Sequence, residues 1–574
     1  MLATIVAAAL VAFALASYRV VTSDLDVLLK MVPDDAFYYL QIARNLAASG
    51  RSTFDGVAPT NGYHPLWMAI LTVVAAVVDD KTTLLRCAVA LSLTVHATVA
   101  CLVALAIRRL VDDAWGALAA VCWLVNPLAF AIAITATEAE VYAVMAVTVF
   151  LAHLALATRL DRRELPPLSQ FLRYGGSLGL LCLARTEGGI ITVVAVVWLA
   201  AVVFSKTGGF STGMPRVVAC GAALVLTIAP WWLFSLSQVG TIVQDSGAMK
   251  MLWAADVFPT AISRVQNVAD TFWYFGRRTL ALMTVWNYSV ATFLVAAATL
   301  AIAPMMVMIR LGRSIQGHAV RAIGVVMVAL TVVYGLAFVE RQIWWLTLPC
   351  LSTVIVMVIA FPTWLRSQAR GHSLEAAARV GVALLMLALF VRWHLKGHTP
   401  YPWQPDVRRS QLAIETVVPA TGRIGCFNAG IPAFFGSGRV VGLDGLVNHD
   451  AHLAWRSRRL DEFIARAGIS YIADEERIVI KAQRFASTPL MLSELSSYPL
   501  RGWPTGRRVL WQVGSGQRRS GPTSVGPESN GRDLNRANGE GRSPRSATRS
   551  TPSPTATRIA DTPGARRSSH PAAP

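Results

Sequence analysis

The chain has 574 residues, of which 54% are hydrophobic and only 15% are charged, and its formal net charge is +19. A soluble protein carries about 25% charged residues, so this composition excludes an ordinary soluble enzyme. Many basic residues lie in short segments between apolar runs or in the last 60 residues. Membrane insertion favours basic loops of this kind, so the positive charge is not evidence for nucleic-acid binding.

Apolar runs of about 18 or more residues recur along the first 394 positions, and each is long enough to cross a hydrocarbon layer about 30 Å thick. Placing the basic loops in the cytoplasm predicts about eleven spans, with the N-terminus inside and all residues after 394 outside. The predicted spans are 3–22, 84–107, 114–134, 141–158, 172–184, 188–205, 217–236, 289–309, 322–339, 343–360 and 376–394. The apolar run 65–78 is short for a span, and we expect it to lie along the outer surface or to be re-entrant.

Under this topology, polar residues gather at the outer ends of the spans. The first outer loop, residues 23–83, contains the adjacent carboxylates Asp34 and Asp35 and the corner Tyr63-His64-Pro65. Further along the chain come Glu138, the turn Arg185-Thr186-Glu187, and Lys250. Charges at a membrane edge are costly unless they are paired or face a wet cavity, so this gathering predicts a site on the outer face. Purely structural roles remain open for the Arg185–Glu187 pair and for Lys250, which can extend to the interface.

Residues 395–514 change character and predict a small extracytoplasmic α/β domain. Short alternating runs predict strands at 423–428, 439–444 and 469–474, and helical patterns occupy 407–418 and 456–467. Asn428, Asp444 and Asn448 fall near the strand ends, where ligand contacts are common. The domain is expected to bind an acceptor, to cover the site, or to be only structural. Residues 515–574 are rich in Ser, Thr, Pro, Gly and Arg and predict a disordered tail.

The order of these features resembles the GT-C superfamily of integral membrane glycosyltransferases, which use polyprenyl-phosphate sugars. The acidic pair Asp34-Asp35 soon after the first span, the Tyr63-His64-Pro65 corner, Glu138 and the Ala184–Glu187 turn carry the resemblance. It covers about residues 1–514, with 1–394 as the transmembrane catalytic domain. The segments around Asp34, Tyr63, Lys250 and Asp444 are similar to a bacterial subgroup related to mannosyl- and arabinofuranosyltransferases.

This resemblance implies the inverting transfer of a sugar from a polyprenyl-phosphate donor to a glycan, lipid or protein acceptor, on the outer face of a bacterial cytoplasmic membrane. Polyprenyl phosphate is a good leaving group, so the reaction needs one carboxylate to remove the proton of the attacking hydroxyl. Asp34 or Asp35 is the predicted base; the other orients a sugar hydroxyl, caps the following helix, or holds a cation. An N-cap without catalytic function is the alternative for this pair.

Candidate residues for the donor phosphate and sugar are Arg185, Glu187, Lys250, His64, Tyr63 and Glu138, because a phosphate at a membrane edge needs cations or other donors. Weaker candidates for the acceptor or for a lid are Asn428, Asp444 and Asn448. The cysteines show no zinc spacing and no metal site is predicted. A divalent cation shared by Asp34, Asp35 and Glu138 remains open.

Two other functional classes remain possible on the sequence. One is a transporter or flippase of a lipid-linked glycan, which calls for ionisable residues near the middle of the membrane and for repeated broken helices. Apart from His96, His153 and the Arg185/Glu187 turn, the predicted spans carry little of this. The other is a non-catalytic membrane subunit that binds a glycan.

Overall fold

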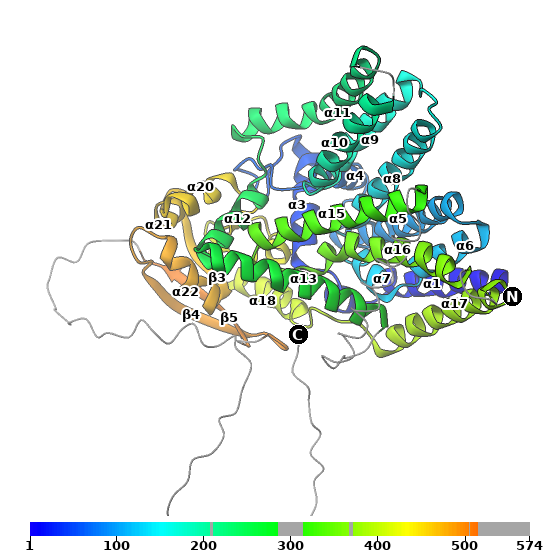
Figure 1. Cartoon of the computed structure of the whole chain (residues 1–574). Helices are drawn as coiled ribbons and strands as arrows, with labels where there is room; N and C mark the ends of the chain where they lie inside the picture. Colours follow the sequence, from blue (N-terminus) through cyan, green and yellow to red (C-terminus); the bar gives the residue numbers. More distant parts are fainter. Residues whose placement is uncertain (207–209, 285–313, 367–370, 504–505, 515–574) are drawn as a thin grey trace, which may run out of the picture. The chain divides into compact units, whose positions relative to one another are not determined.

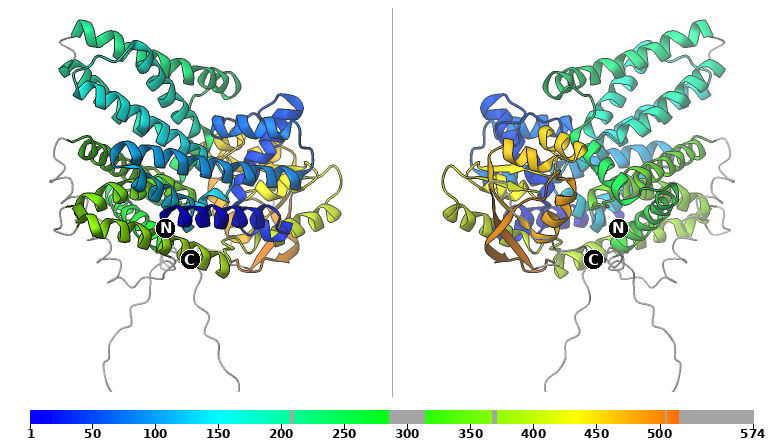
Figure 2. Two further views of the ribbon diagram at one scale, coloured as in Figure 1. Left: turned by 90° about the vertical axis from the view of Figure 1, so that its right-hand side faces the viewer. Right: turned by 90° about the vertical axis from the view of Figure 1, so that its left-hand side faces the viewer.

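The computed structural model describes residues 1–206, 210–284, 314–366, 371–503 and 506–514. The predicted span 289–309 and the predicted tail 515–574 lie outside these ranges. Residues Met1–Gly516 form one compact unit. It contains a body of long helices and, at one end of that body, a small domain with a sheet (Figures 1 and 2).

The helical body follows the predicted spans closely. Its helices are α1 (Leu2–Val21), α2 (Leu25–Leu29), α3 (Asp34–Ser49), α4 (Pro65–Ala75), α5 (Lys81–Leu110), α6 (Asp113–Leu124), α7 (Pro127–Ala133), α8 (Ala139–Asp161), α9 (Leu168–Ala184), α10 (Gly188–Lys206), α11 (Phe210–Val239), α12 (Asp245–Val257), α13 (Ala261–Thr284), α15 (Ile315–Ala337), η1 (Ile343–Leu346), α16 (Thr347–Arg366) and α17 (Gly371–Lys396). Among the described residues, eight helices are long and apolar enough to cross a membrane, or nine if the bent pair α6–α7 counts as one span. The 17-residue α9, on the predicted span 172–184, is not one of them.

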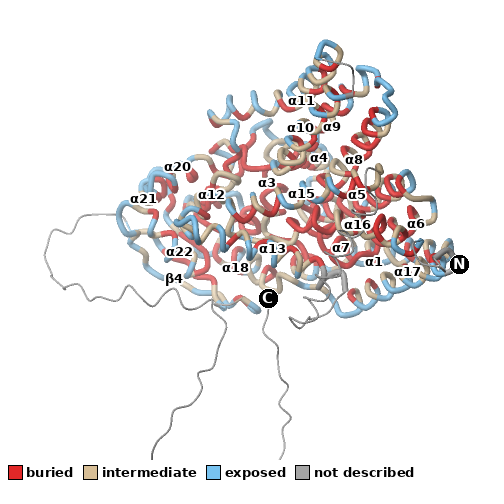
Figure 3. Tube along the Cα trace, in the orientation of Figure 1, coloured by how far each residue is buried: buried red, intermediate tan, exposed pale blue. Residues whose placement is uncertain are grey.

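Exposed residues run along the outside of several of these helices (Figure 3), and many of them are large and apolar. Leu226 and Leu233 of α11 are 72% and 67% exposed, and Leu384 and Leu385 of α17 are 50% and 58% exposed. Water does not tolerate a continuous apolar surface of this kind, whereas lipid does. The predicted polytopic helical membrane protein is therefore confirmed.

The predicted single span 114–134 is two helices instead, α6 and α7, which meet at 57°. Asn126 separates them, and its side chain accepts hydrogen bonds from the amides of Leu128 (2.9 Å) and Ala129 (3.2 Å). Pro127 follows as the first residue of α7, a position that suits proline and prevents the preceding helix from continuing. The prediction missed this bend because the two helices together are long and apolar enough for one span.

The C-terminal domain is a mixed α/β structure, as predicted. Its elements are α18 (Gln404–Val417), β1 (Arg423–Cys426), α19 (Gly430–Phe435), β2 (Val440–Gly442), α20 (His449–Ser457), α21 (Leu460–Arg466), β3 (Ile469–Glu475), α22 (Glu476–Ala482), η2 (Gln483–Phe485), β4 (Leu492–Pro499) and β5 (Arg507–Val513). The sheet order is β2-β1-β3-β5-β4, with β1 parallel to β2 and β3, and β5 antiparallel to β3 and β4. The three predicted strands are β1, β2 and β3, whereas β4 and β5 were not predicted.

The start of α3 joins this domain to the helical body. Phe37 on α3 packs against Phe434 and Phe435 of α19, with ring centroids 5.6 and 5.7 Å apart. The rings of Phe37 and Phe434 are fully buried and belong to the same hydrophobic core as the membrane helices. Because β1, β2 and β3 are parallel, their carboxyl ends share one edge of the sheet. Contacts from Asp34 and Tyr38 connect that edge to the first turns of α3.

Candidate active site

Asp34 and Asp35 are the first two residues of α3, and their side chains have different surroundings. The carboxylate of Asp34 accepts hydrogen bonds from the backbone amides of Gly430 (3.0 Å) and Ile431 (2.7 Å), at the start of α19. The expectation that one aspartate caps its own helix is therefore wrong, because Pro33 is the N-cap of α3 and Asp34 caps α19. A Cβ on Gly430 would lie 2.3 Å from the carbonyl oxygen of Asp34, so only glycine permits this approach.

One turn further along α3, Tyr38 fixes the loop that follows β1. Its hydroxyl accepts a hydrogen bond from the amide of Ala429 (3.0 Å) and donates to Oδ2 of Asp444 (2.7 Å). Asp474, at the end of β3, accepts from the amide of Asn428 at 2.8 Å. Burial raises the pKa of both Asp34 and Asp444 to about 7. Through these hydrogen bonds, Asp34 and Asp444 connect α3 of the helical body to the C-terminal domain.

Asp35 is only partly buried, and among the described residues its carboxylate has no hydrogen bond or ion pair. It lines three cavities, with volumes of about 520, 340 and 330 Å³. Burial raises the pKa of Asp35 to about 6, while the positive charge of Lys250 opposes the rise and Glu340 and Glu138 add to it. A carboxylate with such a pKa is mostly ionised at pH 7 and can still accept a proton.

The largest of the three, here called the donor cavity, brings most of the predicted donor residues together. Its lining includes Asp35, His64, Glu138, Arg185, Glu187 and Lys250. Tyr63 is not among the residues that line it. The hydroxyl of Tyr63 lies 2.8 Å from Oγ of Ser52, and its ring packs against Trp231 with centroids 5.3 Å apart. Tyr63 thus supports the wall from behind.

Arg185 is fully buried and its guanidinium is largely occupied by protein groups. It makes a bidentate pair with Glu187, with bonds of 3.0 and 3.1 Å, and lies 3.4 Å from Oε1 of Glu138. It also donates to the carbonyl oxygen of Trp344 at 3.2 Å. His64 approaches Glu138 at 3.7 Å, and burial lowers the pKa of this histidine. Two glutamates thus more than balance the charge of Arg185, which favours a structural role for it over phosphate binding.

Lys250, on α12, differs from Arg185 in its surroundings. Within the described part of the chain, no carboxylate lies within ion-pair distance of its ammonium group. The ammonium stands over the ring of Trp345, 5.7 Å from the centroid. A lysine in a cavity without a paired carboxylate is well placed to meet an anionic ligand.

The other two cavities lie between the helical body and the sheet domain. The cavity of about 340 Å³ is here called the sheet-side cavity, and the one of about 330 Å³ the α18-side cavity. Asn428 lines both, and Asp444 lines the sheet-side cavity. Asn448 lines neither: its side chain caps α20 through the amide of Ala451 (3.0 Å) and donates to Asp55 (2.9 Å). Of the three residues predicted for the acceptor, two reach a cavity and one holds the domain in place.

The comparisons with known proteins give the fold. ArnT from Cupriavidus metallidurans bound to undecaprenyl phosphate matches 89% of this chain and 97% of its own, with a TM-score of 0.52 at 14% identity. The apo state of the same protein gives the same values. The chain has the GT-C fold. AglB from Archaeoglobus fulgidus, in complex with an inhibitory peptide and a dolichol-phosphate, has a TM-score of 0.47 at 12% identity, covering 84% of this chain and 70% of its own. No protein-family model matches the sequence, and no curated protein does either.

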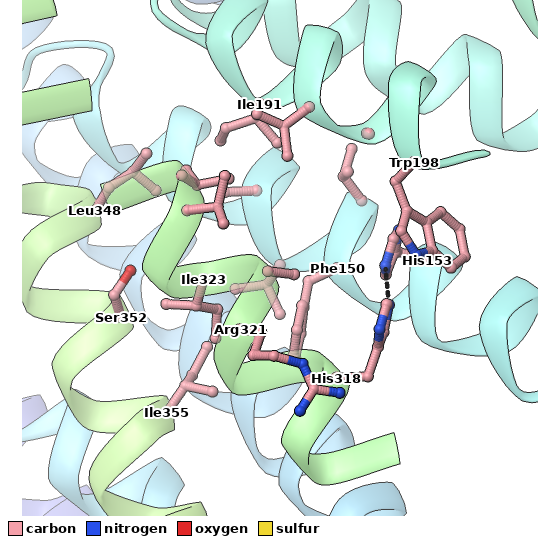
Figure 4. A pocket seen from close by; sticks show the side chains of 18 of the residues that line it. Phe150, His153, Ile191, Trp198, His318, Arg321, Ile323, Leu348, Ser352 and Ile355 are labelled. Carbon is pink, nitrogen blue, oxygen red and sulfur yellow. Dashed lines mark hydrogen bonds between the residues drawn. The ribbon is translucent and has the colours of Figure 1, made fainter. Parts of the chain in front are cut away.

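This GT-C fold also contains an apolar cavity of about 530 Å³ that shares no lining residue with the three around Asp35. It lies among α8, α10, α15 and α16 (Figure 4). At one end, Nε2 of His153 and Nε2 of His318 are 3.2 Å apart, beside Trp198. None of the predicted site residues lines this cavity.

The structure also bears on the divalent cation that Asp34, Asp35 and Glu138 could share. Among the described residues, no group of three His, Cys, Asp or Glu side chains is arranged to hold a metal ion. Both oxygens of Asp34 already accept amide hydrogen bonds. The three acids named from the sequence therefore do not form a metal cluster.

Sequence reasoning missed several residues around Asp35. Trp344 lines the donor and α18-side cavities, and Tyr401, Trp403 and Trp503 line the α18-side cavity. Gln244 lines the donor cavity and donates to the carbonyl oxygen of Tyr63 at 2.5 Å. Aromatic residues are common near membrane interfaces, so composition did not distinguish these from ordinary interfacial residues. Only the folded chain brings them together.

Proposed function

We propose that this protein transfers a sugar from a polyprenyl-phosphate donor to a hydroxyl acceptor on the outer face of the membrane, with inversion at the anomeric carbon and with Asp35 as the general base. The observation that carries this proposal is the position of Asp35. Its carboxylate lines all three cavities and, among the described residues, has no hydrogen-bond partner. A donor in one cavity and an acceptor in another therefore meet at one base.

The donor cavity suits a lipid-linked phosphosugar. Most of its lining is apolar, with Ile228, Trp231 and Val333 among its residues, and the lining also includes Lys250 and Asp35. The apolar residues suit an isoprenoid chain, and the ammonium of Lys250 offers the phosphate a charge-assisted hydrogen bond. A protein of the same fold, ArnT from Cupriavidus metallidurans, was crystallised bound to undecaprenyl phosphate, which supports this choice of donor.

In the proposed reaction, the acceptor oxygen attacks the anomeric carbon from the side opposite the phosphate. The bond between that carbon and the phosphate oxygen breaks, and polyprenyl phosphate leaves as an anion beside Lys250. Asp35 takes the proton of the attacking hydroxyl. Phosphate needs no protonation to leave, so a single carboxylate is enough and a single displacement inverts the configuration.

Asp34 serves in this proposal as a positioning residue. Both of its oxygens accept backbone amide hydrogen bonds from α19, so its lone pairs point toward the C-terminal domain. Those bonds hold the loop 427–431 and, with it, Asn428 beside Asp35. In this proposal Asp34 positions the loop 427–431, and Asp35 removes the proton.

The outer face is the proposed location because of the basic loops. Arg108, Arg159 and Arg366 lie at the ends of α5, α8 and α16. The cavity residue Glu138 lies at the opposite end of α8 from Arg159, and the cavity residue Trp344 lies just before the opposite end of α16 from Arg366. The positive-inside rule puts those arginines in the cytoplasm, and Asp35 and the C-terminal domain then face the opposite side.

The experiment uses full-length protein in lipid nanodiscs with a panel of labelled polyprenyl-phosphate sugars and envelope material as acceptor. We expect one donor to be consumed, polyprenyl phosphate to be released in equal amount, and the product to carry the opposite anomeric configuration by NMR. Failure of every donor in the panel would exclude the proposed donor class. A product that retains the donor configuration would exclude single displacement.

A further inference from the structure

The sheet-side and α18-side cavities have walls rich in aromatic rings, at positions far apart in the sequence. Trp253, Phe427, Trp455 and Phe485 line the sheet-side cavity. Trp344, Tyr401, Trp403 and Trp503 line the α18-side cavity. The two cavities share Asp34, Asp35, Gln342 and Asn428, so they meet beside the proposed base.

The rings form two packed clusters. Trp455 lies 4.3 Å from Phe485 and 6.2 Å from Phe427, measured between ring centroids. Trp403 and Trp503 lie 4.3 Å apart at an interplanar angle of 63°. The Nε1 atom of Trp503 is buried and, within the described residues, has no acceptor. A fixed aromatic wall of this kind loses little conformational entropy when a ligand packs on it.

The charged groups of both cavities are mostly acidic. The sheet-side cavity has Lys481 and the carboxylates of Asp34, Asp35, Asp256, Glu340 and Asp444. The α18-side cavity has Arg508 and the carboxylates of Asp34, Asp35, Asp474 and Glu475. Arg508 is buried and already donates to Gln411 (3.0 Å) and to the carbonyl oxygen of Ala473 (3.1 Å). A phosphorylated or sulfated ligand would meet repulsion here, because like charges at close range are unfavourable.

We propose that the acceptor is a neutral oligosaccharide that occupies both cavities, with its reacting hydroxyl at Asp35 and its neighbouring sugar units against the two aromatic clusters. This inference rests on the proposed transferase function for the reaction, and it adds the class of acceptor. Sugar rings present C–H groups on their faces and hydroxyls on their edges. The faces pack on aromatic rings, and the edges hydrogen-bond to carboxylates and to the amides of Asn428 and Gln342.

A lipid acceptor fits these cavities less well. The acceptor end of a lipid is followed by a long alkyl chain, which would have to cross the carboxylates between the two clusters. Burying such groups against a chain without hydrogen-bond partners is costly. A ligand with hydroxyls along its length satisfies the same carboxylates at every unit. Volumes of about 340 and 330 Å³ fall within the range of small-molecule sites.

The test measures binding, separately from transfer. Full-length protein carrying Asp35→Asn, to prevent turnover, is placed in nanodiscs and titrated by calorimetry with oligosaccharides released from the envelope of the producing cells. These are separated into neutral and anionic fractions, and a hydroxyl-bearing peptide mixture serves as a third probe. We expect binding of the neutral fraction alone, weakened at least tenfold by Trp455→Leu and by Trp503→Leu.

Trp364→Leu is the matched control, because Trp364 is 44% exposed and lies near the far end of α16. We expect it to leave binding unchanged, and Trp503→Phe to retain part of it. Binding of undecaprenyl phosphate by each variant checks that the fold and the donor cavity are intact. If a Leu variant loses that binding, its result is set aside. Trp503→Phe, which we expect to bind the neutral fraction more weakly than the parent protein, then decides the acceptor inference.

Each result decides one of the two claims. Absence of binding by the neutral fraction, binding only by the anionic fraction or by peptide, or tryptophan variants that bind like the parent would overturn the acceptor inference. In those cases, undecaprenyl phosphate still binds if the proposed transferase function is correct. If the parent protein binds neither undecaprenyl phosphate nor any acceptor fraction, the proposed function fails as well.

Discussion

The backbone amide of Ile431 donates a hydrogen bond of 2.7 Å to Oδ1 of Asp34. The other oxygen of Asp34 accepts from Gly430, so this carboxylate is bound to the C-terminal domain. Asp35, the next residue, lines the cavities instead. Two identical side chains in sequence therefore have different surroundings, and their substitution should have different effects.

Replacing Asp35 with Asn should abolish transfer while donor binding remains. A general base contributes about 10²- to 10⁴-fold to a rate, and an amide cannot accept the proton. Asp34→Asn keeps one oxygen that accepts an amide hydrogen bond, so we expect less than a tenfold loss of rate and a small decrease in thermal stability. Initial rates with a labelled donor and binding of undecaprenyl phosphate measure both. Equal rates for Asp35→Asn and the parent protein would rule out Asp35 as the base.

The pH profile should follow the ionisation of Asp35. Its pKa is about 6, and only the deprotonated carboxylate accepts a proton, so kcat/KM should fall as the pH drops below about 6. Lys250 lowers this pKa and Glu340 raises it. Lys250→Met should therefore move the acidic limb to higher pH, and Glu340→Gln should move it to lower pH. Shifts in the same direction for both variants would contradict the assignment.

The buried pair of Arg185 and Glu187 should matter more to stability than to phosphate binding. Arg185→Gln leaves Glu138 and Glu187 buried without their cation, which typically costs about 3–5 kcal/mol. The double variant Arg185→Gln/Glu187→Gln should recover part of that loss. Thermal unfolding in nanodiscs measures it, and Arg108→Gln is the control because the Arg108–Asp113 pair is exposed. A double variant no more stable than Arg185→Gln alone would show that the pair is not the cause.

Gly430→Ala should disturb the contact between Asp34 and α19. The added methyl group would lie 2.3 Å from a backbone oxygen, which cannot turn away as a side chain can. Forcing extra volume into a packed site usually costs about 1–3 kcal/mol. We expect faster amide hydrogen exchange over residues 427–435 and a lower thermal midpoint. Gly221→Ala, where the methyl group meets nothing within 4 Å, should change neither.

Stability should decrease as the pH rises from about 4 to about 7, partly because of Asp444. Burial raises its pKa from 3.8 to about 7, so the folded protein holds a proton that the unfolded chain has released over that range. By linkage, the free energy of unfolding falls with pH wherever the folded state binds more protons. Asp444→Asn should reduce the slope. The exposed Asp113→Asn should leave it unchanged, and an unchanged slope in Asp444→Asn would contradict the assigned pKa.

The amino-acid sequence alone predicts the class of the protein, most of its long apolar helices and three of its five strands. Hydrophobic length and the position of basic loops are local properties, and they placed the spans and put Asp35, Glu138, Arg185 and Lys250 on one side. The alternation in residues 395–514 predicted β1, β2 and β3. The strand β4 was missed because most of its residues are exposed and it therefore carries little apolar alternation. The strand β5 is largely buried, but its apolar run, residues 509–511, is only three residues long.

Which of the two aspartates lacks a hydrogen-bond partner among the described residues depends on long-range packing, because the partners of Asp34 lie about 400 residues away in the chain. The same reason explains why Arg185 is neutralised by Glu138, and why Trp403 and Trp503 form one wall. A sequence gives the chemistry of a side chain and its place in a helix or strand. Which groups are left to meet a substrate depends on long-range packing, which no local pattern records.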